Sequence, residues 1–416
     1  MRVGVCTLGC KVNAYESEFI ISLFKNHNYE ICDFNEVCDI YVINTCTVTN
    51  NSDSKSRKMI NHARKLNKDA CLVVCGCFVE SAKDYDFKDV DIVIGNYNKS
   101  KIVELVEEFF IEKKQIKLND NIMLCPFEDM FITNSYSHTR AFVKIQDGCE
   151  NYCSYCIIPF VRGRCRSKDK DKVLDEIKAL VNNGFKEIVL TGIHTGNYGV
   201  DLGIKFSSLL EEILKIEGLK RLRISSIEIT ELDDKFFKLL ENKVICDHLH
   251  IPLQNGSEKI LKLMNRKYDK KYFLDVINKI RKIRPDISIT TDVIVGFPFE
   301  TEEEFLENLD FIKEINFSKV HVFPYSKRNG TKAARMDNQV DGITKKSRVK
   351  RLIALSDELE LSYRNKFIDK DLDVLIERYE NGISYGHTSN YLYLKINDKL
   401  EENEIVNVCV KDDMFD

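Results

Sequence analysis

Short apolar runs alternate with helical patterns through the first quarter of the chain. A strand followed by a helix, repeated, is typical of a parallel sheet with helices on both faces. We therefore predict a doubly wound parallel α/β domain over residues 1–111, followed by a polar linker or small hairpin over residues 112–139. The runs that predict its strands are RVGVC (2–6), IYVIN (40–44), CLVVC (71–75) and DIVIG (91–95).

Six more strand patterns follow, separated by helical patterns such as those at 173–183 and 302–315. Repeated strand and helix units predict a partial (β/α)6 barrel over residues 140–368, with reactive groups at the carboxyl ends of its strands. The runs are AFVKIQ (141–146), EIVLTGI (187–193), RLRISSI (221–227), HLHIPLQ (248–254), ITTDVIVGFP (289–298) and KVHVFPY (319–325).

The remaining residues, 371–416, contain the strand-like runs VLIER, YLYLKI and IVNVCV and no helical pattern. They predict a small β-barrel as a third unit. The fold class is therefore α/β, in three domains.

Composition narrows the class of protein. The 416 residues are 44% hydrophobic, which is enough to give several domains a core. The start of the chain lacks the features of a signal peptide and no apolar run is long enough to span a membrane, so we expect a cytoplasmic protein without membrane contact. Fifteen cysteines in such a protein favour metal or redox chemistry over disulfides. The net charge of −4 neither indicates nor excludes a nucleic-acid partner.

Cys149, Cys153 and Cys156 follow the first predicted strand of the barrel. Structural zinc requires four ligands, and only Cys165, nine residues further on, could supply a fourth thiol nearby. Three thiolates suit a four-iron, four-sulfur cluster that leaves one iron open for a small ligand.

Cys10, Cys46 and Cys77 each follow one of the first three predicted strands. Loops after parallel strands meet at one edge of a sheet, so we expect these cysteines to form a second site. Cys75, two positions before Cys77, is an alternative third ligand. Ordinary core packing is the interpretation for the cysteines Cys6, Cys32, Cys38, Cys71, Cys246 and Cys409.

The cysteine triplet, with Tyr155 before its last cysteine, resembles the signature of the radical S-adenosylmethionine (SAM) superfamily. Further motifs resemble the methylthiotransferases, and TLGCKVN and RGR resemble the branch that acts on threonylcarbamoyladenosine (t6A) in tRNA. The chain departs from that pattern at Ala14 and Phe299. The motifs are TLGCKVNAYESE (7–18), INTCTVT (43–49), GC (76–77), AFVKIQDGCENYCSYCIIP (141–159), RGRCRS (162–167), HIPLQNGS (250–257), DVIVGFPFET (292–301) and FPYSKRNGT (323–331).

The resemblance implies an enzyme with two 4Fe-4S clusters that adds a methylthio group at C2 of t6A next to the anticodon. The cluster on Cys10, Cys46 and Cys77 would carry a sulfur that one SAM methylates, and the cluster on the triplet would cleave a second SAM. It implies a low-potential electron donor such as flavodoxin or ferredoxin. Five residues match family positions near SAM, although turn and strand-end structure would explain them equally well: Gly192, Gln254, Asp292, Gly296 and Pro298.

The strongest candidate for RNA contact is the segment 326–351, which contains nine Lys or Arg and only two Asp. Arg162, Arg164 and Arg166 beside the triplet add smaller support. The tail resembles a TRAM domain, but its eleven acidic and four basic residues do not suit a phosphate binder. Tyr391 and Tyr393 could stack on bases, although alternating tyrosines in a short strand more often serve packing.

Two other interpretations stay open. One is a methylthiotransferase that acts on isopentenyladenosine in tRNA or on a ribosomal protein. The other is a non-enzymatic iron-sulfur protein that binds RNA, which would not need the SAM positions.

Overall fold

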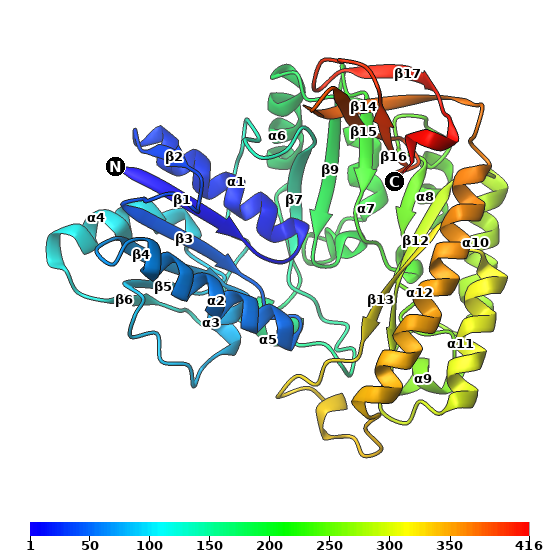
Figure 1. Cartoon of the computed structure of the whole chain (residues 1–416), viewed down its shortest axis with the longest axis horizontal. Helices are drawn as coiled ribbons and strands as arrows, with labels where there is room; N and C mark the ends of the chain where they lie inside the picture. The colour runs from blue at the N-terminus through cyan, green and yellow to red at the C-terminus, as the bar shows by residue number, and fades with distance from the viewer. Residues whose placement is uncertain (416) are drawn as a thin grey trace.

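The computed structural model describes residues 1–415. Its N-terminal domain is a parallel sheet of order β2-β1-β3-β4-β5-β6, at the left of Figure 1. The strands are β1 (Arg2–Thr7), β2 (Glu30–Cys32), β3 (Ile40–Thr45), β4 (Cys71–Gly76), β5 (Ile92–Ile94) and β6 (Ile116–Leu118), and the helices are α1 (Lys11–Asn26), α2 (Asn50–Leu66), α3 (Cys77–Ser81) and α4 (Ile102–Glu112).

Helices cover both faces of this sheet, as the alternation along β3 shows. Ile40 and Val42 pack on one face with residues of α1 and α4. Tyr41 and Ile43 pack on the other with residues of α2 and α3. Every residue of β3 is buried, which explains why the central strands read as continuous apolar runs. The doubly wound sheet predicted from the sequence is confirmed.

Two features of this domain differ from the sequence analysis. Strand β6 lies inside the stretch expected to be a linker and extends the sheet beside β5. Cys32 and Cys38, interpreted as separate core cysteines, are paired as a disulfide. The residue limits of the three domains stay a prediction.

The central domain is an open barrel. Sheets β10-β9-β7-β8 and β11-β12-β13 are joined by parallel bridges from Leu222 to Ile245 and from Ser226 to His250. The six predicted strands are present, in chain order around the barrel, and β8 adds a short antiparallel partner to β7. Their bounds are β7 (Ala141–Asp147), β8 (Arg166–Ser167), β9 (Glu187–Gly192), β10 (Arg221–Ile224), β11 (His248–His250), β12 (Ser288–Val295) and β13 (Lys319–Pro324).

Helices surround this barrel, and the long α12 lies along its outer side beside α10 and α11 (Figure 1). None of the helices within residues 1–415 is long and apolar enough to cross a bilayer. Their bounds are α5 (Ile158–Arg162), α6 (Lys170–Asn182), α7 (Phe206–Ile213), α8 (Asp234–Leu239), α9 (Glu258–Leu263), α10 (Lys270–Ile283), α11 (Glu302–Ile315) and α12 (Gly342–Asn365). Short 3₁₀ turns are η1 (Lys99–Lys101), η2 (Thr195–Asn197), η3 (Val200–Leu202), η4 (Ile229–Glu231), η5 (Ala333–Arg335) and η6 (Asp412–Met414).

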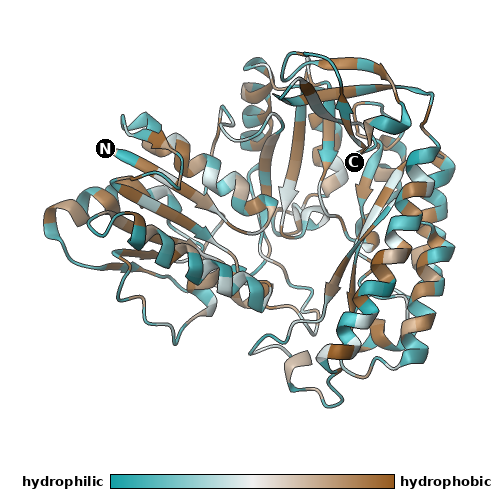
Figure 2. Ribbon diagram, in the orientation of Figure 1, coloured by the Kyte–Doolittle hydropathy of each residue, from teal (hydrophilic) through white to brown (hydrophobic). Residues whose placement is uncertain are grey.

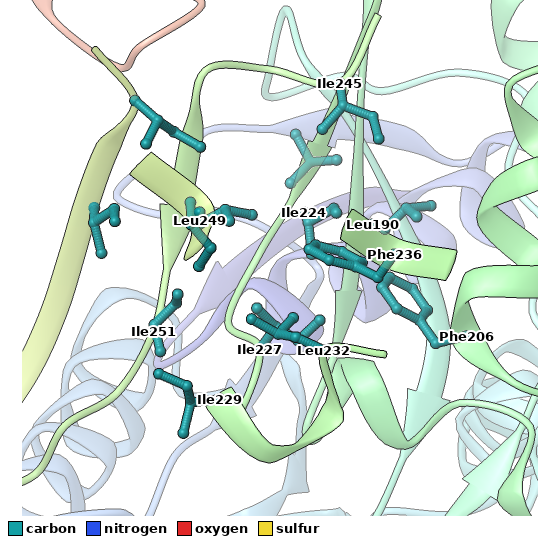
Figure 3. Close-up of a cluster of buried hydrophobic side chains, with 14 of the residues drawn as sticks. Leu190, Phe206, Ile224, Ile227, Ile229, Leu232, Phe236, Ile245, Leu249 and Ile251 are labelled. Carbon is teal, nitrogen blue, oxygen red and sulfur yellow. The ribbon is translucent and has the colours of Figure 1, made fainter. Parts of the chain in front are cut away.

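The largest core lies between the barrel strands and these helices. Figure 3 shows part of it, where Leu190 and Ile224 from the strands meet Phe206 and Phe236 from the helices. Figure 2 shows the same division, with hydrophobic strands and helices whose outer faces are polar. Each fully buried side chain of this kind stabilises the fold by about 1.5–3 kcal/mol. The core extends into the N-terminal domain through Tyr15 and Phe19 of α1, so the two domains share a packed interface.

The C-terminal unit is an antiparallel sheet of order β16-β15-β14-β17, in the stretch for which the sequence predicts a small all-β unit. Its strands are β14 (Asp371–Glu380), β15 (Ile383–Thr388), β16 (Tyr393–Ile396) and β17 (Ile405–Cys409). It covers the end of the barrel where strands begin, because Arg221 at the start of β10 donates to the carbonyls of His387 and Asp373. The carboxyl ends of the strands are left for the candidate site.

Candidate active site

Cys149, Cys153 and Cys156 lie in the loop that follows β7, at the carboxyl end of the barrel. This loop is held by hydrogen bonds to the segment after α9. Ser154 donates its backbone N–H to the carbonyl of Met264 at 3.0 Å and its hydroxyl to that of Leu263 at 2.7 Å. The structure therefore gives the three thiols a fixed frame.

Gly148 makes the turn into this loop. Its φ is +74°, and a Cβ at this position would lie 1.8 Å from the carbonyl oxygen of Arg164. A residue with a side chain would have to move the RGR segment away. The backbone N–H of Cys149 then bonds the carbonyl of Gly163 at 3.1 Å, which ties the first cysteine to the same segment.

Charged groups surround the triplet. Arg266 donates Nη1–H to Cys153 Sγ at 3.3 Å and is paired with Glu228. His194 Nδ1 lies 3.7 Å from Cys149 Sγ, and its Nε2 contacts Glu231. Burial lowers the pKa of His194, but its hydrogen bonds to Cys149 and Glu231 raise it to about 10. An imidazolium and a guanidinium thus face two of the three sulfurs.

Cys156 is a buried thiol that is hard to deprotonate. Burial and the neighbouring Cys153 thiolate raise its pKa to about 12. A buried thiol of this kind is inert by itself and becomes a thiolate when a metal replaces its proton. The donor set therefore suits a metal cluster better than free nucleophilic chemistry.

Cys10, Cys46 and Cys77 gather at the carboxyl edge of the N-terminal sheet, as the strand order predicts. Cys10 caps α1, Cys46 follows β3 and Cys77 begins α3. A Cβ on Gly9 would lie only 2.7 Å from the Cβ of Cys46. Burial raises the pKa of Cys46, and the thiolates of Cys77 and Cys10 raise it further.

Cys75, the alternative ligand, stays in the core. It lies in the buried strand β4 and donates to Asn44 Oδ1 at 3.8 Å. Burial raises its pKa to about 12. The geometry therefore favours Cys77 as the third cysteine of this site.

The two cysteine sites face each other across the domain boundary. Cys77 packs against Ile157 and Val161, and Ile157 directly follows Cys156 in the chain. No group of three His, Cys, Asp or Glu side chains within residues 1–415 converges on a single-ion site.

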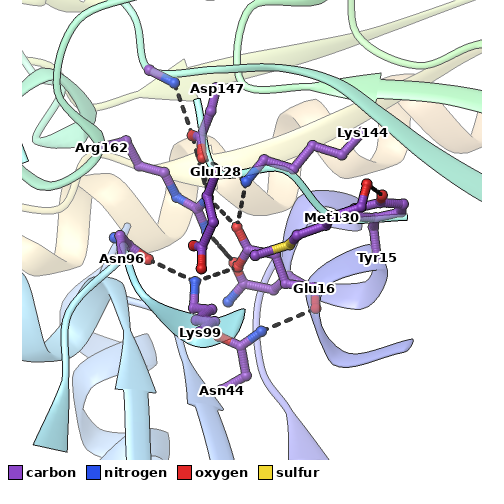
Figure 4. Close-up of polar contacts among 12 residues, drawn as sticks. Tyr15, Glu16, Asn44, Asn96, Lys99, Glu128, Met130, Lys144, Asp147 and Arg162 are labelled. Atoms are coloured by element: carbon purple, nitrogen blue, oxygen red, sulfur yellow. Dashed lines mark hydrogen bonds and ion pairs between the residues drawn. The ribbon is translucent and has the colours of Figure 1, made fainter. Parts of the chain in front are cut away.

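A buried network of charges joins the two sites, and the sequence analysis missed it (Figure 4). Glu16 of α1 is fully buried and pairs with Lys99 at 2.6 Å, Lys144 at 2.8 Å and Arg162 at 2.7 Å. Burial raises the pKa of Glu16, but these three cations hold it well below its usual range. Asp147 at the end of β7 pairs with Lys144 and Arg162 as well. The sequence contains one sign of this network. Lys144 interrupts an apolar strand, and a lysine buried in a strand requires a buried partner.

The expected SAM residues lie at the carboxyl ends of three strands. Gly192 ends β9 beside Gln146, whose Oε1 accepts the N–H of His194 at 2.7 Å. Gln254 follows β11 and bonds the backbone of Asp292 and Ile294.

On β12, Asp292 lies 3.3 Å from His250 Nε2, and Gly296 and Pro298 follow the strand. Tyr155 packs against Phe297 and Tyr325 of this side. The fold brings these residues to the triplet's end of the barrel; their contact with SAM stays a prediction.

Some of the cations in the basic segment 326–351 are paired with groups inside the protein. Arg328 is buried and donates to Asp53, Asn50 and Thr47 of the N-terminal domain at 2.7–2.8 Å. Arg348 is buried beside Glu300. Lys332, Arg335 and Lys346 are exposed. The segment also bonds the triplet loop, through the N–H of Ala333 and the carbonyl of Ser154 at 2.7 Å.

The structure bears on two other expectations about RNA contact: it buries two of the three arginines beside the triplet, and it agrees with packing for Tyr391. Arg162 and Arg166 are buried, so only Arg164 of that group reaches solvent. Tyr391 packs inside the protein, with ring centroids 4.6 Å from His248 and 4.7 Å from His387. Packing between the tail and the barrel accounts for this residue.

A barrel whose first strand leads into three framed thiols, with a further three thiols beside them, defines a radical SAM protein with a second cysteine site. Family models agree: Radical SAM superfamily matches residues 143–312, and Uncharacterized protein family UPF0004 matches residues 2–95. A relative with 46% identity over 94% of this chain goes further and shows that the chain belongs to the family of the threonylcarbamoyladenosine tRNA methylthiotransferases.

Curated relatives carry this assignment. The chain is 46% identical to Threonylcarbamoyladenosine tRNA methylthiotransferase MtaB of Bacillus subtilis (strain 168), over 94% of this chain and 89% of the relative. It is 37% identical to the tRNA-2-methylthio-N(6)-dimethylallyladenosine synthase of Natranaerobius thermophilus, over 89% of this chain and 84% of the relative.

Solved structures support the fold alone. The radical S-adenosylmethionine methyltransferase TsrM from Kitasatospora setae matches with a TM-score of 0.59 at 14% identity, covering 80% of this chain and 76% of that one. The radical enzyme OxsB matches with a TM-score of 0.52 at 12% identity, covering 88% of this chain and 61% of that one.

Proposed function

We propose that this enzyme inserts a methylthio group at C2 of N6-threonylcarbamoyladenosine next to the anticodon of tRNA, converting t6A to ms2t6A. The observation that carries the proposal is the 46% identity to the Bacillus subtilis relative, which extends over 94% of this chain. The isopentenylated substrate is the second candidate, because the relatives named for it are up to 37% identical. The lower identity places it second.

The cofactors are SAM and 4Fe-4S clusters. When bound, the cluster with an open iron supplies the electron that splits SAM into a radical, and the other cluster supplies the sulfur. In the proposal Cys149, Cys153 and Cys156 hold the first of these and Cys10, Cys46 and Cys77 hold the second. A radical is required because the C2–H bond of a purine offers no acidic proton to a general base.

The chain's own residues position the reactants and exclude water. Tyr155, which lies between Cys153 and Cys156 in the chain, packs against an apolar cluster that includes Phe297 and Tyr325, and this packing would shield a radical from solvent. Proposed SAM contacts are Tyr155, Gly192, Gln254, Asp292, Gly296 and Pro298. The contact of Cys77 with Ile157 brings the two sites close enough to act on one base.

The proposed partners follow from this chemistry. The enzyme acts in the cytoplasm on tRNA that already carries t6A, and a low-potential protein such as flavodoxin or ferredoxin supplies electrons. The exposed cations of segment 326–351 lie on the same side as the triplet loop and suit phosphate contact.

Mass spectrometry of tRNA nucleosides tests the proposal. Anaerobically reconstituted enzyme with SAM and a reductant should convert t6A to ms2t6A, and the Cys77→Ala variant should not. A Cys75→Ala variant serves as the matched control and should keep the activity. Conversion of isopentenyladenosine without conversion of t6A would reject the proposed substrate and leave the reaction class intact.

A further inference from the structure

Arg162 is a fully buried guanidinium placed between the two cysteine sites. It ends α5, six residues after Cys156, yet it donates Nε–H to Cys77 Sγ of the other site at 3.3 Å. Its terminal nitrogens donate to Glu16 at 2.7 Å and to Asn13 at 2.5 Å. One side chain of the barrel domain therefore fixes a cysteine of the N-terminal domain.

Arg162 belongs to a buried network of charges of both signs beside Cys77. The other cations of this network are Lys99, Lys144 and Arg166, and its paired anions are Glu16 and Asp147. Glu80 of α3 also interacts with Arg162 and Lys99. Burial lowers the pKa of Arg162, but Cys77, Glu16, Asp147 and Cys10 raise it well above its usual value, so it stays charged. Asn96 adds a neutral N–H donor to Cys77 Sγ, also at 3.3 Å.

Donors and positive charge at a ligating sulfur act on the electronics of an iron-sulfur cluster. Both stabilise the additional negative charge of the reduced form, so they raise its reduction potential. The effect is strong in a buried site, where water does not screen it.

We propose that Arg162 is a positioning residue that holds Cys77 and raises the reduction potential of the cluster bound by Cys10, Cys46 and Cys77. The inference rests on the cluster assignment in the proposed function. In this proposal a buried arginine, and not only the cysteines, determines the reduction potential of the site from which sulfur is transferred. It also couples this site to the barrel domain, since Arg162 belongs to the segment that follows the SAM triplet.

The test measures the potential of this cluster alone. In a full-length Cys149→Ala, Cys153→Ala, Cys156→Ala background, reconstituted protein should bind about four irons. We expect Arg162→Gln to make reduction at least tenfold less favourable, a fall of about 59 mV for a one-electron couple, in a redox titration followed by electron paramagnetic resonance. Arg162→Lys, which keeps the charge, should recover most of this shift.

A second variant should shift the reduction potential in the opposite direction. Glu16→Gln removes a negative charge beside Arg162 and keeps the donor to Cys77, so the potential should rise. A purely structural role would lower the iron content of both variants and would not move the two potentials in opposite directions. Arg164→Gln, exposed two residues further on, is the matched control and should leave the potential unchanged.

The outcomes separate the two claims. If the background protein binds no iron, the proposed second cluster and this inference both fail. If it binds iron and Arg162→Gln leaves the potential unchanged, only the inference is overturned. If Arg162→Gln cannot take up iron, Asn96→Ala decides, because it deletes the other donor to Cys77 without changing charge. A lowered reduction potential supports the claim that donors to Cys77 Sγ raise the potential of this cluster, and an unchanged potential overturns it.

Discussion

Gly148 decides whether the SAM triplet can form its loop. Because a Cβ would lie 1.8 Å from the Arg164 carbonyl oxygen, Gly148→Ala must displace either the RGR segment or the triplet. We expect the variant to lose the iron of the triplet, so that reconstituted protein holds about four irons instead of about eight. Iron and sulfide analysis measures this directly.

The control for this change is Gly184→Ala. Gly184 also has a positive φ of +94°, but a Cβ there would meet nothing within 4 Å. Gly184→Ala should lower the stability of the fold by the backbone cost of about 1–2 kcal/mol, and the variant should keep both clusters. Equal iron content in the two variants would show that the close approach to Arg164 does not matter.

Single residues differ in how well their roles can be predicted from sequence. The spacing of Cys149, Cys153 and Cys156 indicates a site by itself, because ligands must come at fixed separations. Arg162 does not, since an arginine in a basic motif is usually exposed and only tertiary packing buries it. Its partners Glu16 and Asn13 are distant in the chain and carry no local signal.

Helices and strands could likewise be predicted only where their own residues show a clear hydrophobic pattern. The fully buried strands β3 and β4 and the mostly buried β12 were predicted from their apolar runs, and α11 agrees with its predicted range of 302–315. Strands β2 and β6 were missed because each is only partly buried and contains a charged residue, so neither forms an apolar run, and pairing with their neighbours defines them. β15 was missed for a different reason: glycine, serine and histidine interrupt its alternation.

Arg328 fastens the loop after β13 to the N-terminal domain. Its three hydrogen bonds reach Thr47, Asn50 and Asp53 across the boundary. Arg328→Ala removes them and leaves Asp53 without its cation, so we expect faster proteolysis within residues 326–341. The exposed neighbour gives the control, Lys327→Ala, which should be cut at the wild-type rate. Limited proteolysis with mass spectrometry locates the cuts, and equal rates would contradict the role of Arg328.

Glu187 and Arg223 form a buried pair where β9 and β10 begin, 2.6 Å apart. Burial raises the pKa of Glu187, but the charge and hydrogen bonds of Arg223 hold it below the ordinary value of 4.5. A carboxyl whose pKa is lowered on folding stabilises the protein above its unfolded pKa, and this contribution is lost as the pH falls through the folded value.

Glu187→Gln should therefore lower the unfolding free energy at pH 7 by about 3–5 kcal/mol, since it leaves Arg223 buried without a counter-charge. Below pH 4.5 the difference from wild type should shrink. Urea denaturation of the iron-free protein at several pH values measures both effects, with the exposed Glu241→Gln as control. A difference that stays constant with pH would contradict this account.

On the scale of the whole molecule, the tail and the cysteine sites occupy opposite ends of the barrel. The tail contacts Arg221 and Arg223 where strands begin, whereas the triplet and the basic segment lie where strands end. A tRNA that presents its anticodon base to the cysteines would meet the basic segment first. The acidic composition of the tail agrees with this order of contact.

The salt dependence of tRNA binding tests this placement. Replacing Lys332, Arg335 and Lys346 by glutamine should weaken binding and reduce the slope of log K against log salt by about 0.7–0.9 for each phosphate that the variant no longer neutralises. The matched control replaces Lys65, Lys68 and Lys88, which are equally exposed but lie where the N-terminal strands begin. Both triple variants change the net charge equally, so a general field effect would lower both slopes alike. A reduced slope in the first variant alone places the phosphates beside the triplet loop, because only local neutralisation releases counterions there.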